Sequence, residues 1–386
     1  MKGLESDLEQ RRAAGLYRRR RIIDSAQGVE TVVDGKPVIS FCGNDYLGLA
    51  NHPEIVQALV QAAAEYGVGS GAAHLINGHG RLHEDCELRL AEFTGRDRAL
   101  LFSTGYMANL AIAAALLGRK DAIFQDRLNH ASLIDGAHLS GARLHRFRHL
   151  DLDQLERLLS EQAGAKRKLI MSDGVFSMDG DCADLNRISG IAVRHHAWVM
   201  LDDAHGFGVL GARGAGLLEQ QGISQEQVPV LMATLGKAAG TAGAFVAGSD
   251  ALIETLIQQA RPYIFTTAQP PAIAAATLRA IDLIEQEAWR REKLMESIAY
   301  FRAQMQDLEF ELMNSQTAIQ PIVVGDNHRA LSLSEALFEQ GIHVTAIRPP
   351  TVPEGGARLR ITLSAAHEPG HIDVLIAALR QAMQKP

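Results

Sequence analysis

A single lysine carries the strongest chemical signal in this sequence. Lys237 is the only charged residue between Gln227 and Ser249, in a chain that has eight lysines against thirty arginines. A lysine held among apolar residues loses hydration, so its pKa falls and its neutral amine can attack a carbonyl group. The alternative is a lysine whose ammonium group reaches water along its apolar stem. The local sequence leaves both open.

Acidic and imidazole side chains follow a second apolar run. Asp202, Asp203 and His205 come directly after the run Trp198–Leu201. Because burying two carboxylates without partners is costly, a carboxylate here could serve to keep a heterocyclic nitrogen protonated. The alternative is a solvated turn in which an aspartate caps a helix.

Two more groups follow strand-like runs. Gly105 stands among hydroxyl side chains after Ala99–Phe102, where a helix rich in Ala and Leu is expected to begin. Free backbone N–H groups at such a helix start suit a phosphate, although a plain Ser/Thr cap is the other interpretation. His130, after the run Ala122–Phe124, could stack on an aromatic cofactor or cap a helix.

One glycine motif points elsewhere. Gly206–Gly211 matches G-x-G-x-x-G. A dinucleotide-binding loop needs its first glycine directly after a strand and a helix directly after the motif. Four other residues follow the strand here, and Gly214 and Gly216 would break a helix. We therefore expect no nicotinamide site.

These groups sit within an alternation of short apolar runs and helix-length amphipathic segments. That order predicts an α/β fold with a mostly parallel central sheet, in which ligands bind beyond the carboxyl ends of the strands. The expected strands are Ala99–Phe102, Ala122–Phe124, Leu169–Met171, Trp198–Leu201, Val228–Met232 and Ala244–Ala247.

The two ends of the chain read differently. We expect an N-terminal helix and hairpin segment over residues 1–45, a large domain over 46–280 and a smaller α+β C-terminal domain over 281–386. The expected elements are a helix over 4–21, a hairpin over 31–41, a helical stretch over 270–308, strands at 319–324, 343–347 and 359–363, and a helix over 371–383.

Composition excludes several classes of protein. The formal net charge is −7, and the three cysteines form no Cys-x-x-Cys pair. These features argue against a nucleic-acid partner, a disulfide scaffold and a cysteine-based metal site. No apolar run approaches the roughly 18 residues of a membrane span. The Arg18–Arg21 run is interpreted as a solvated helix face or a local anion site. We expect a cytoplasmic protein with no metal and no membrane partner.

The lysine, the strand-end aspartate and the helix start together fit pyridoxal 5'-phosphate (PLP), which offers an aldehyde, a pyridine nitrogen and a phosphate. At these positions the chain resembles the α-oxoamine synthases, which are fold-type I PLP enzymes, over nearly its whole length. The matching blocks are Asn44–Leu49, Gly69–Ala72, Phe102–Asn109, Asn129–Leu133, Asp173–Asp181, Asp202–Gly206, Thr234–Lys237 and Arg358–Thr362.

The resemblance implies roles for individual residues. Lys237 would form the imine with PLP and later remove the substrate Cα proton, Asp202 would pair with the pyridine nitrogen, and His130 would stack on the ring. His205 would join these three as a catalytic residue. The remaining PLP contacts would come from Gly105, Tyr106, Ser177, His205 and Thr234, and from Thr266 and Thr267 of a neighbouring subunit. Substrate would be bound by Arg18, Asn44, His130, Thr351 and Arg360, with Arg360 as the carboxylate clamp.

The resemblance also implies an activity. It would be a decarboxylating Claisen condensation in a homodimer with shared active sites. Arg348–Pro353 and Ala73–His79 look like the branch that joins L-alanine to a pimeloyl thioester, carried on coenzyme A or a carrier protein, in biotin biosynthesis. The alternative is the glycine C-acetyltransferase branch, which condenses glycine with acetyl-CoA. A third hypothesis is a non-catalytic dimer that binds an anion or nucleic acid through Arg18–Arg21.

Overall fold

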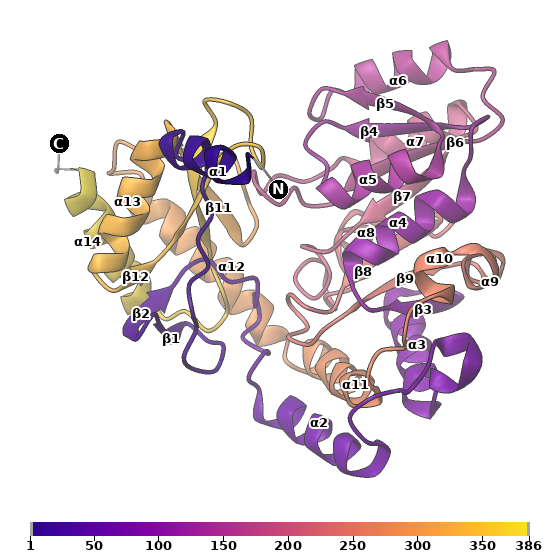
Figure 1. Ribbon diagram of the computed structural model, residues 1–386, viewed down its shortest axis with the longest axis horizontal. Helices are drawn as coiled ribbons and strands as arrows, with labels where there is room; N and C mark the ends of the chain where they lie inside the picture. Colours follow the sequence, from indigo (N-terminus) through magenta and orange to yellow (C-terminus); the bar gives the residue numbers. More distant parts are fainter. Residues whose placement is uncertain (1–2, 384–386) are drawn as a thin grey trace. The chain divides into compact units, whose positions relative to one another are not determined.

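The computed structural model describes residues 3–383, which fold into two compact units (Figure 1). One unit runs to Asn51, takes in Met178–Asp181 and resumes at Trp289. The other comprises His52–Ser177 and Cys182–Ala288. We call the first the small unit and the second the large unit. No helix within residues 3–383 has both the length and the apolar character needed to cross a membrane.

The large unit is built on a seven-stranded sheet with the order β3-β9-β8-β7-β6-β4-β5. Its strands are β3 (Arg98–Phe102), β4 (Ala122–Asp126), β5 (Arg143–Phe147), β6 (Lys168–Asp173), β7 (Trp198–Asp202), β8 (Val230–Thr234) and β9 (Ala244–Gly248). Only β9 runs antiparallel to its neighbours within this sheet. The predicted α/β fold with a mostly parallel sheet is confirmed.

Buried apolar side chains hold helices against one face of this sheet. Leu169 and Met171 of β6 belong to a core that also contains Ile112 and Leu133 from two helices. Ile170, equally buried, lies between them in the strand and so points to the opposite face. Both faces are covered, which explains why these strands read as continuous apolar runs. The helices of the large unit are α2 (Pro53–Tyr66), the π-helical turn η1 (His74–Gly78), α3 (Arg81–Thr94), α4 (Gly105–Leu116), α5 (Ala131–Ser140), α6 (Leu152–Glu161), α7 (Leu185–Arg194), α8 (Leu217–Gln221), α9 (Asp250–Gln259), α10 (Arg261–Ile264) and α11 (Pro271–Gln286).

The small unit contains two smaller sheets, with the orders β1-β2-β12 and β10-β11-β14-β13. The first includes the expected hairpin, whose turn is Asp34–Gly35. The elements outside the large unit are α1 (Leu4–Ala13), β1 (Glu30–Val33), β2 (Lys36–Ser40), α12 (Ala288–Met305), β10 (Glu311–Leu312), β11 (Ile319–Gly325), α13 (Asn327–Glu339), β12 (Ile342–His343), β13 (Thr345–Ile347), β14 (Ala357–Thr362) and α14 (Pro369–Met383).

Four predictions about elements were wrong. The expected strand over 343–347 is two short strands, β12 and β13, which belong to different sheets. The opening helix ends at Ala13, because Gly15 adopts a positive φ of 65° that closes the helix. Arg18–Arg21 therefore lie outside any helix. Strand β8 begins two residues later than expected, after Pro229, which has no N–H to give to the ladder. Strand β5 was missed because it pairs only with β4 at the sheet edge, where charged residues are tolerated.

Helices α4 and α5 pack closely against each other. Gly136 of α5 is buried, and a Cβ built on it would lie 2.7 Å from the backbone oxygen of Asn109 in α4. The two helices can lie this close only because residue 136 has no side chain. The contact fixes both helix starts, which follow β3 and β4 at the carboxyl edge of the sheet.

Gly136→Ala is therefore expected to destabilise the fold by about 1–3 kcal/mol, the usual cost of overpacking. Gly190→Ala is the matched control, because its Cβ would meet only the end of the Arg194 side chain, at 3.7 Å. That change should stabilise α7 by about 0.5–1 kcal/mol through helix propensity. Urea unfolding of both variants measures the two effects, and equal stabilities would contradict this description of the packing.

Candidate active site

A cavity of about 190 Å³ lies at the carboxyl edge of the large sheet. Its walls come from the ends of β6, β7 and β8 and from the starts of α4 and α5. Of the residues expected to bind PLP or to act in catalysis, the cavity is lined by Gly105, Tyr106, His130, Ser177, Asp202, His205, Thr234 and Lys237. The sequence placed these residues after separate strands, and the parallel sheet gathers them into one place.

Lys237 and His205 meet on one side of the cavity. The Lys237 Nζ lies 2.9 Å from His205 Nε2, and both side chains are half-buried. Lys237 follows β8 in the turn that leads to β9 and lines a cavity rich in polar side chains. An amine so close to an imidazole can exchange a hydrogen bond or a proton with it.

Asp202 is the last residue of β7, and both oxygens of its carboxylate accept hydrogen bonds. It is 6% exposed. Its Oδ1 accepts from the Ala204 N–H at 3.1 Å, and its Oδ2 accepts from Asn109 Nδ2 at 2.7 Å. A buried carboxylate held in this way is fixed in position as an acceptor on the cavity wall.

Asp173 stands beside Asp202 because β6 and β7 pair in register at these two residues. Burial raises the pKa of Asp173 well above its usual value, and the neighbouring Asp202 carboxylate adds to the effect. Asp173 Oδ2 accepts the backbone N–H of His130 at 3.0 Å. The two carboxyl groups thus have different tasks: Asp173 fixes the backbone of His130, and Asp202 faces Asn109.

His130 both caps α5 and lines the cavity. Its Nδ1 accepts the Ser132 N–H at 3.3 Å, as an N-cap side chain does. His130 is exposed in the open cavity, yet partial desolvation by the surrounding protein lowers the pKa of its imidazole below its usual value. The neutral imidazole is therefore favoured at neutral pH.

The remaining wall offers backbone N–H groups. Helix α4 begins at Gly105, capped by Thr104, whose hydroxyl accepts from the Met107 N–H at 3.2 Å. Across the cavity rim, Thr234 Oγ1 donates to Gly243 O at 3.0 Å and accepts from the Gly236 N–H at 3.4 Å. A helix start next to hydroxyl groups suits the dianionic phosphate of a cofactor.

The donor set fits PLP. The cavity presents one amine, a carboxylate anchored at the end of a buried strand, an imidazole and a helix start. These match the aldehyde, the pyridine nitrogen, the ring face and the phosphate of that cofactor in kind and in number. The residues that would hold it are Lys237, Asp202, His130, Gly105 and Thr234.

Asp203 lies next to Asp202 but is excluded from this cavity. It is fully buried, its Oδ2 accepts the Leu217 N–H at 2.8 Å, and burial raises the pKa of its carboxyl to about 8. Cβ atoms built on Gly206 and Gly216 would lie about 2 Å from its oxygens. Two of the glycines in this loop are therefore needed to enclose a carboxyl group.

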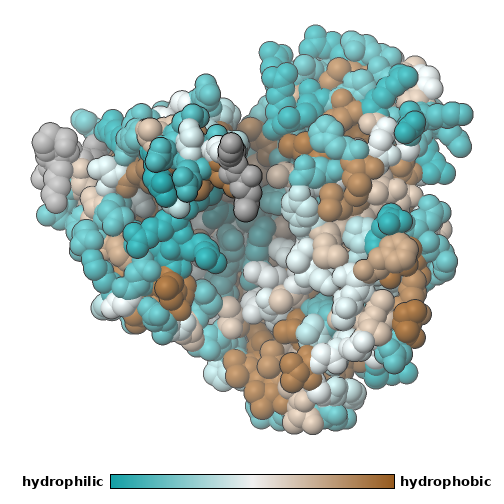
Figure 2. Space-filling model, in the orientation of Figure 1, coloured by the Kyte–Doolittle hydropathy of each residue, from teal (hydrophilic) through white to brown (hydrophobic). Residues whose placement is uncertain are grey.

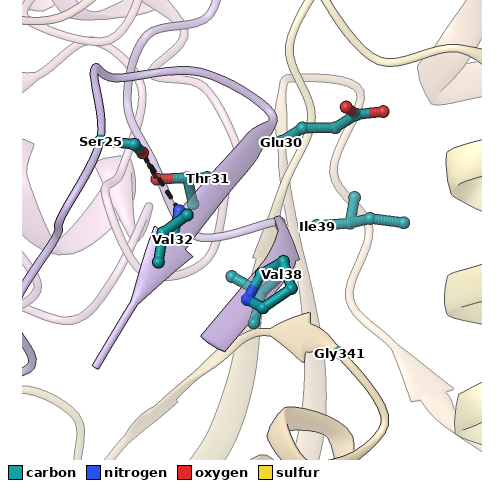
Figure 3. Close-up of a pocket in the computed structure, with 8 residues that line it drawn as sticks. Ser25, Glu30, Thr31, Val32, Val38, Ile39 and Gly341 are labelled. Atoms are coloured by element: carbon teal, nitrogen blue, oxygen red, sulfur yellow. Dashed lines mark hydrogen bonds between the residues drawn. The ribbon is translucent and has the colours of Figure 1, made fainter. Parts of the chain in front are cut away.

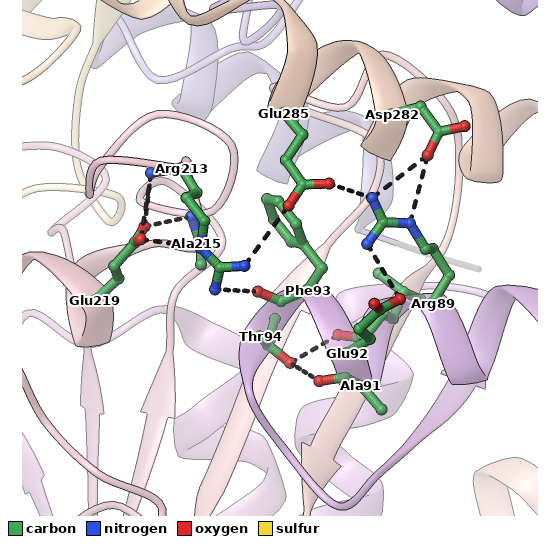
Figure 4. A network of polar contacts seen from close by, with 11 residues as sticks. Arg89, Ala91, Glu92, Phe93, Thr94, Arg213, Ala215, Glu219, Asp282 and Glu285 are labelled. Carbon is green, nitrogen blue, oxygen red and sulfur yellow. Dashed lines mark hydrogen bonds and ion pairs between the residues drawn. The ribbon is translucent and has the colours of Figure 1, made fainter.

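The same loop is held by ion pairs (Figure 4). Glu219 accepts from the Arg213 and Ala215 N–H groups at 3.1 and 3.0 Å, and a Cβ on Gly211 would lie 2.3 Å from Glu219 Oε2. Arg213 also reaches Glu285 of α11 at 3.6 Å. The glycine motif thus folds around acidic side chains, and the loop after His205 is anchored.

The other predicted site residues lie outside this cavity lining. Thr266 and Thr267 follow α10, and Thr267 forms a bridge with Ala73. In the small unit, Arg360 of β14 donates from both terminal nitrogens to Asn44 Oδ1 at 3.3 Å. Arg18 likewise donates to Thr351 Oγ1 at 3.2 Å. Four of the five expected substrate residues thus contact each other in two pairs, and the fifth, His130, lines the cavity.

Sequence reasoning gave no role to Asn109, Ser132 or Asp173, which also line the cavity. All three lie inside the blocks that carry the family resemblance, so their positions were seen but not their contacts. A usable signal was the amide of Asn109 within an otherwise apolar helix. A polar group on the buried face of such a helix needs a partner.

A second cavity and a cluster of potential metal ligands lie outside this site. A cavity of about 380 Å³ beside the hairpin of the small unit is lined mainly by β1 and β2, and Glu30 is the one ionisable residue in its lining (Figure 3). Within the described residues, His79, Glu84 and Glu87 bring potential metal ligands within 4.8 Å of one another. This group lies at the start of α3, where the helix dipole opposes a cation.

Comparisons with known proteins agree with this geometry. The chain matches the family described as "Aminotransferase class I and II" over residues 36–379. An 8-amino-7-oxononanoate synthase of Thioalkalivibrio sulfidiphilus is 58% identical over 384 residues, which cover 100% of this chain and 98% of the relative. One of Pseudomonas aeruginosa is 56% identical over 382 residues, which cover 99% and 95%.

Solved structures share the fold. A serine palmitoyltransferase from S. paucimobilis with a bound PLP–myriocin aldimine has a TM-score of 0.93 and 30% identity, covering 99% of this chain and 96% of that one. An 8-amino-7-oxononanoate synthase from Francisella tularensis has a TM-score of 0.78 and 33% identity, covering 90% and 98%. The chain therefore belongs to the class I and II aminotransferase family and, within it, to the 8-amino-7-oxononanoate synthases of the α-oxoamine synthase group.

Proposed function

We propose that the protein is a PLP-dependent acyltransferase that condenses L-alanine with a pimeloyl thioester. Carbon dioxide and the free thiol leave, and 8-amino-7-oxononanoate is formed for biotin biosynthesis. The observation that carries this proposal is one cavity in which Lys237, His205, Asp202 and His130 meet at the ends of parallel strands. The full-length relatives named for this activity support the choice of substrates.

PLP supplies the reactive groups, and the protein side chains bind and orient it. When bound, PLP supplies an aldehyde for the lysine amine and a ring that accepts electron density from the substrate Cα. Asp202 keeps the pyridine nitrogen protonated, since its carboxylate is already fixed by Ala204 and Asn109. Gly105, Tyr106 and Thr234 bind the phosphate, Ser177 and His205 bind near the phenolic oxygen, and His130 stacks on the ring.

Lys237 also moves a proton. With PLP and alanine bound, the free amine of Lys237 would be the base that removes the substrate Cα proton. His205, 2.9 Å from Nζ, stabilises the neutral amine by hydrogen bonding and orients its lone pair.

Arg360 binds the substrate carboxylate, because a guanidinium that Asn44 already orients loses little entropy on forming a bidentate pair. Arg18 and Thr351, which contact each other, belong to the same binding function.

We also propose a homodimer with shared active sites in the cytoplasm. Thr266 and Thr267 would serve the phosphate of the neighbouring subunit. Exposed apolar side chains support an interface on the large unit: Val68 is 83% exposed, Ile76 78% and Phe265 71%. Hydrophobic surface also appears over α2 (Figure 2), where Val56 and Val60 are exposed. Exposed apolar side chains gathered in this way favour association with a second copy.

Substrate preference tests the proposed function. Steady-state assays should give a kcat/KM for alanine with a pimeloyl thioester at least about tenfold above that for glycine with acetyl-CoA, because the pocket loses a methyl contact with glycine. Both coenzyme A and carrier-protein thioesters of pimelate should be offered. A higher kcat/KM for the glycine and acetyl pair would instead assign the chain to the glycine C-acetyltransferase branch.

Lys237→Ala is expected to abolish turnover, because no other amine lines the cavity among the described residues. Lys120→Ala is the control, since Lys120 is exposed and lies far from the cavity lining. Activity and size-exclusion chromatography should be measured together. We expect an inactive variant that remains folded and dimeric, and retained turnover would remove Lys237 from the mechanism.

Asp202→Asn should lower kcat/KM by roughly 10²–10³-fold, the usual effect of removing one preorganised electrostatic contact. Asp203→Asn is a matched neighbour outside the cavity. Because the pKa of Asp203 is raised to about 8, its carboxyl is mostly protonated at pH 7 and an amide mimics it. Steady-state kinetics at pH 7 should therefore show a severe loss for Asp202→Asn and a small one for Asp203→Asn. Similar losses in both would contradict the assignment.

A further inference from the structure

A continuous chain of hydrogen bonds joins Asp202 to His130. Asn109 Nδ2 lies 2.7 Å from Asp202 Oδ2 and 2.8 Å from Ser132 Oγ. Ser132 Oγ in turn lies 2.7 Å from His130 Nδ1. Asn109 and Ser132 are each 1% exposed, so water is kept from the two contacts of the Asn109 amide, whereas His130 at the end of the chain is exposed in the cavity. The chain crosses from β7 through α4 to the start of α5.

The direction of each hydrogen bond follows from chemistry. The amide NH₂ of Asn109 has two hydrogens and makes two contacts, one to a carboxylate oxygen and one to a hydroxyl oxygen. If the amide were turned round, its oxygen would face the oxygen of Asp202 at 2.7 Å, which is repulsive. Ser132 Oγ therefore accepts from Asn109, and its own hydrogen is left for His130 Nδ1.

A second donor points at the same ring nitrogen. The Ser132 backbone N–H lies 3.3 Å from His130 Nδ1, in the cap of α5. Two donors aimed at Nδ1 require that atom to carry a lone pair. In a neutral imidazole the hydrogen must then be on Nε2.

We propose that Asn109 and Ser132 are positioning residues that lock His130 in the tautomer with its hydrogen on Nε2. They also tie the orientation of this ring to the Asp202 carboxylate. The inference rests on the proposed function, in which Asp202 pairs with the pyridine nitrogen of the cofactor and His130 stacks on the face of the same ring. A single buried network thus sets both groups before any ligand arrives, and leaves one ring N–H of fixed direction beside the substrate.

Nitrogen NMR of the full chain with ¹⁵N-labelled histidine tests the tautomer directly. Spectra should be recorded with PLP bound and after its removal, and the His130 signals assigned by their loss in His130→Asn. We expect the hydrogen on Nε2 and an unprotonated Nδ1 in both forms at neutral pH. A hydrogen on Nδ1 in the wild-type protein would overturn the proposal without any variant.

Substitutions test the part played by the hydroxyl. Ser132→Ala should give a mixture of tautomers and lower kcat/KM about tenfold, the order expected for one lost buried hydrogen bond. Ser132→Thr keeps the hydroxyl and should restore both the wild-type spectrum and most of the rate. Ser140→Ala, on the same helix but outside the cavity, is the control and should change neither. An unaltered His130 spectrum in Ser132→Ala would overturn the role of Ser132.

The outcomes also separate this proposal from the proposed function. The tautomer is read from the protein itself, so it does not depend on which substrates the enzyme condenses. If His130 carries its hydrogen on Nε2 but the enzyme does not use alanine and a pimeloyl thioester, the positioning role of Asn109 and Ser132 is supported and the proposed function is refuted. Normal condensation with the hydrogen on Nδ1 would do the reverse.

Discussion

A carboxylate can be buried at the end of a parallel strand only when hydrogen-bond donors satisfy it, and the site depends on how Asp202 meets this requirement. Its two oxygens accept from Ala204 and Asn109. Asn109 also donates to Ser132 of α5, which requires α4 to lie close against α5, and that packing in turn needs the missing side chain of Gly136. The packing of α4 against α5 therefore also determines where the side chains of the cavity lie.

Neighbouring carboxyl groups show how environment divides their roles. Asp202 and Asp203 are adjacent in sequence, yet alternation along the chain directs one to the cavity and the other into a loop closed by glycines. Asp173, paired in register with Asp202, is buried, its pKa is raised by that burial, and its carboxyl fixes the backbone of His130. One acceptor is thus presented to the cofactor site, while the other two organise the protein around it.

Sequence reasoning reached the α/β fold and the strand-end positions of Lys237, Asp202 and His130, because burial on both faces of a parallel sheet leaves a clear apolar pattern. It missed β5, whose charged edge residues lack that pattern, and extended the first helix past Gly15. It also gave no role to Asn109 or Ser132. Their importance lies in contacts between elements far apart in the chain, which local spacing does not record. The roles of the site residues remain predictions.

A visible absorption titration measures whether Lys237 binds PLP and whether the bound cofactor responds to alanine. PLP added to the purified protein should give a band of lysine-bound cofactor that is absent in Lys237→Ala. L-alanine should then shift the band at lower concentration than glycine does. A protein that gives no such band, or whose band responds to glycine and is indifferent to alanine, would contradict the account.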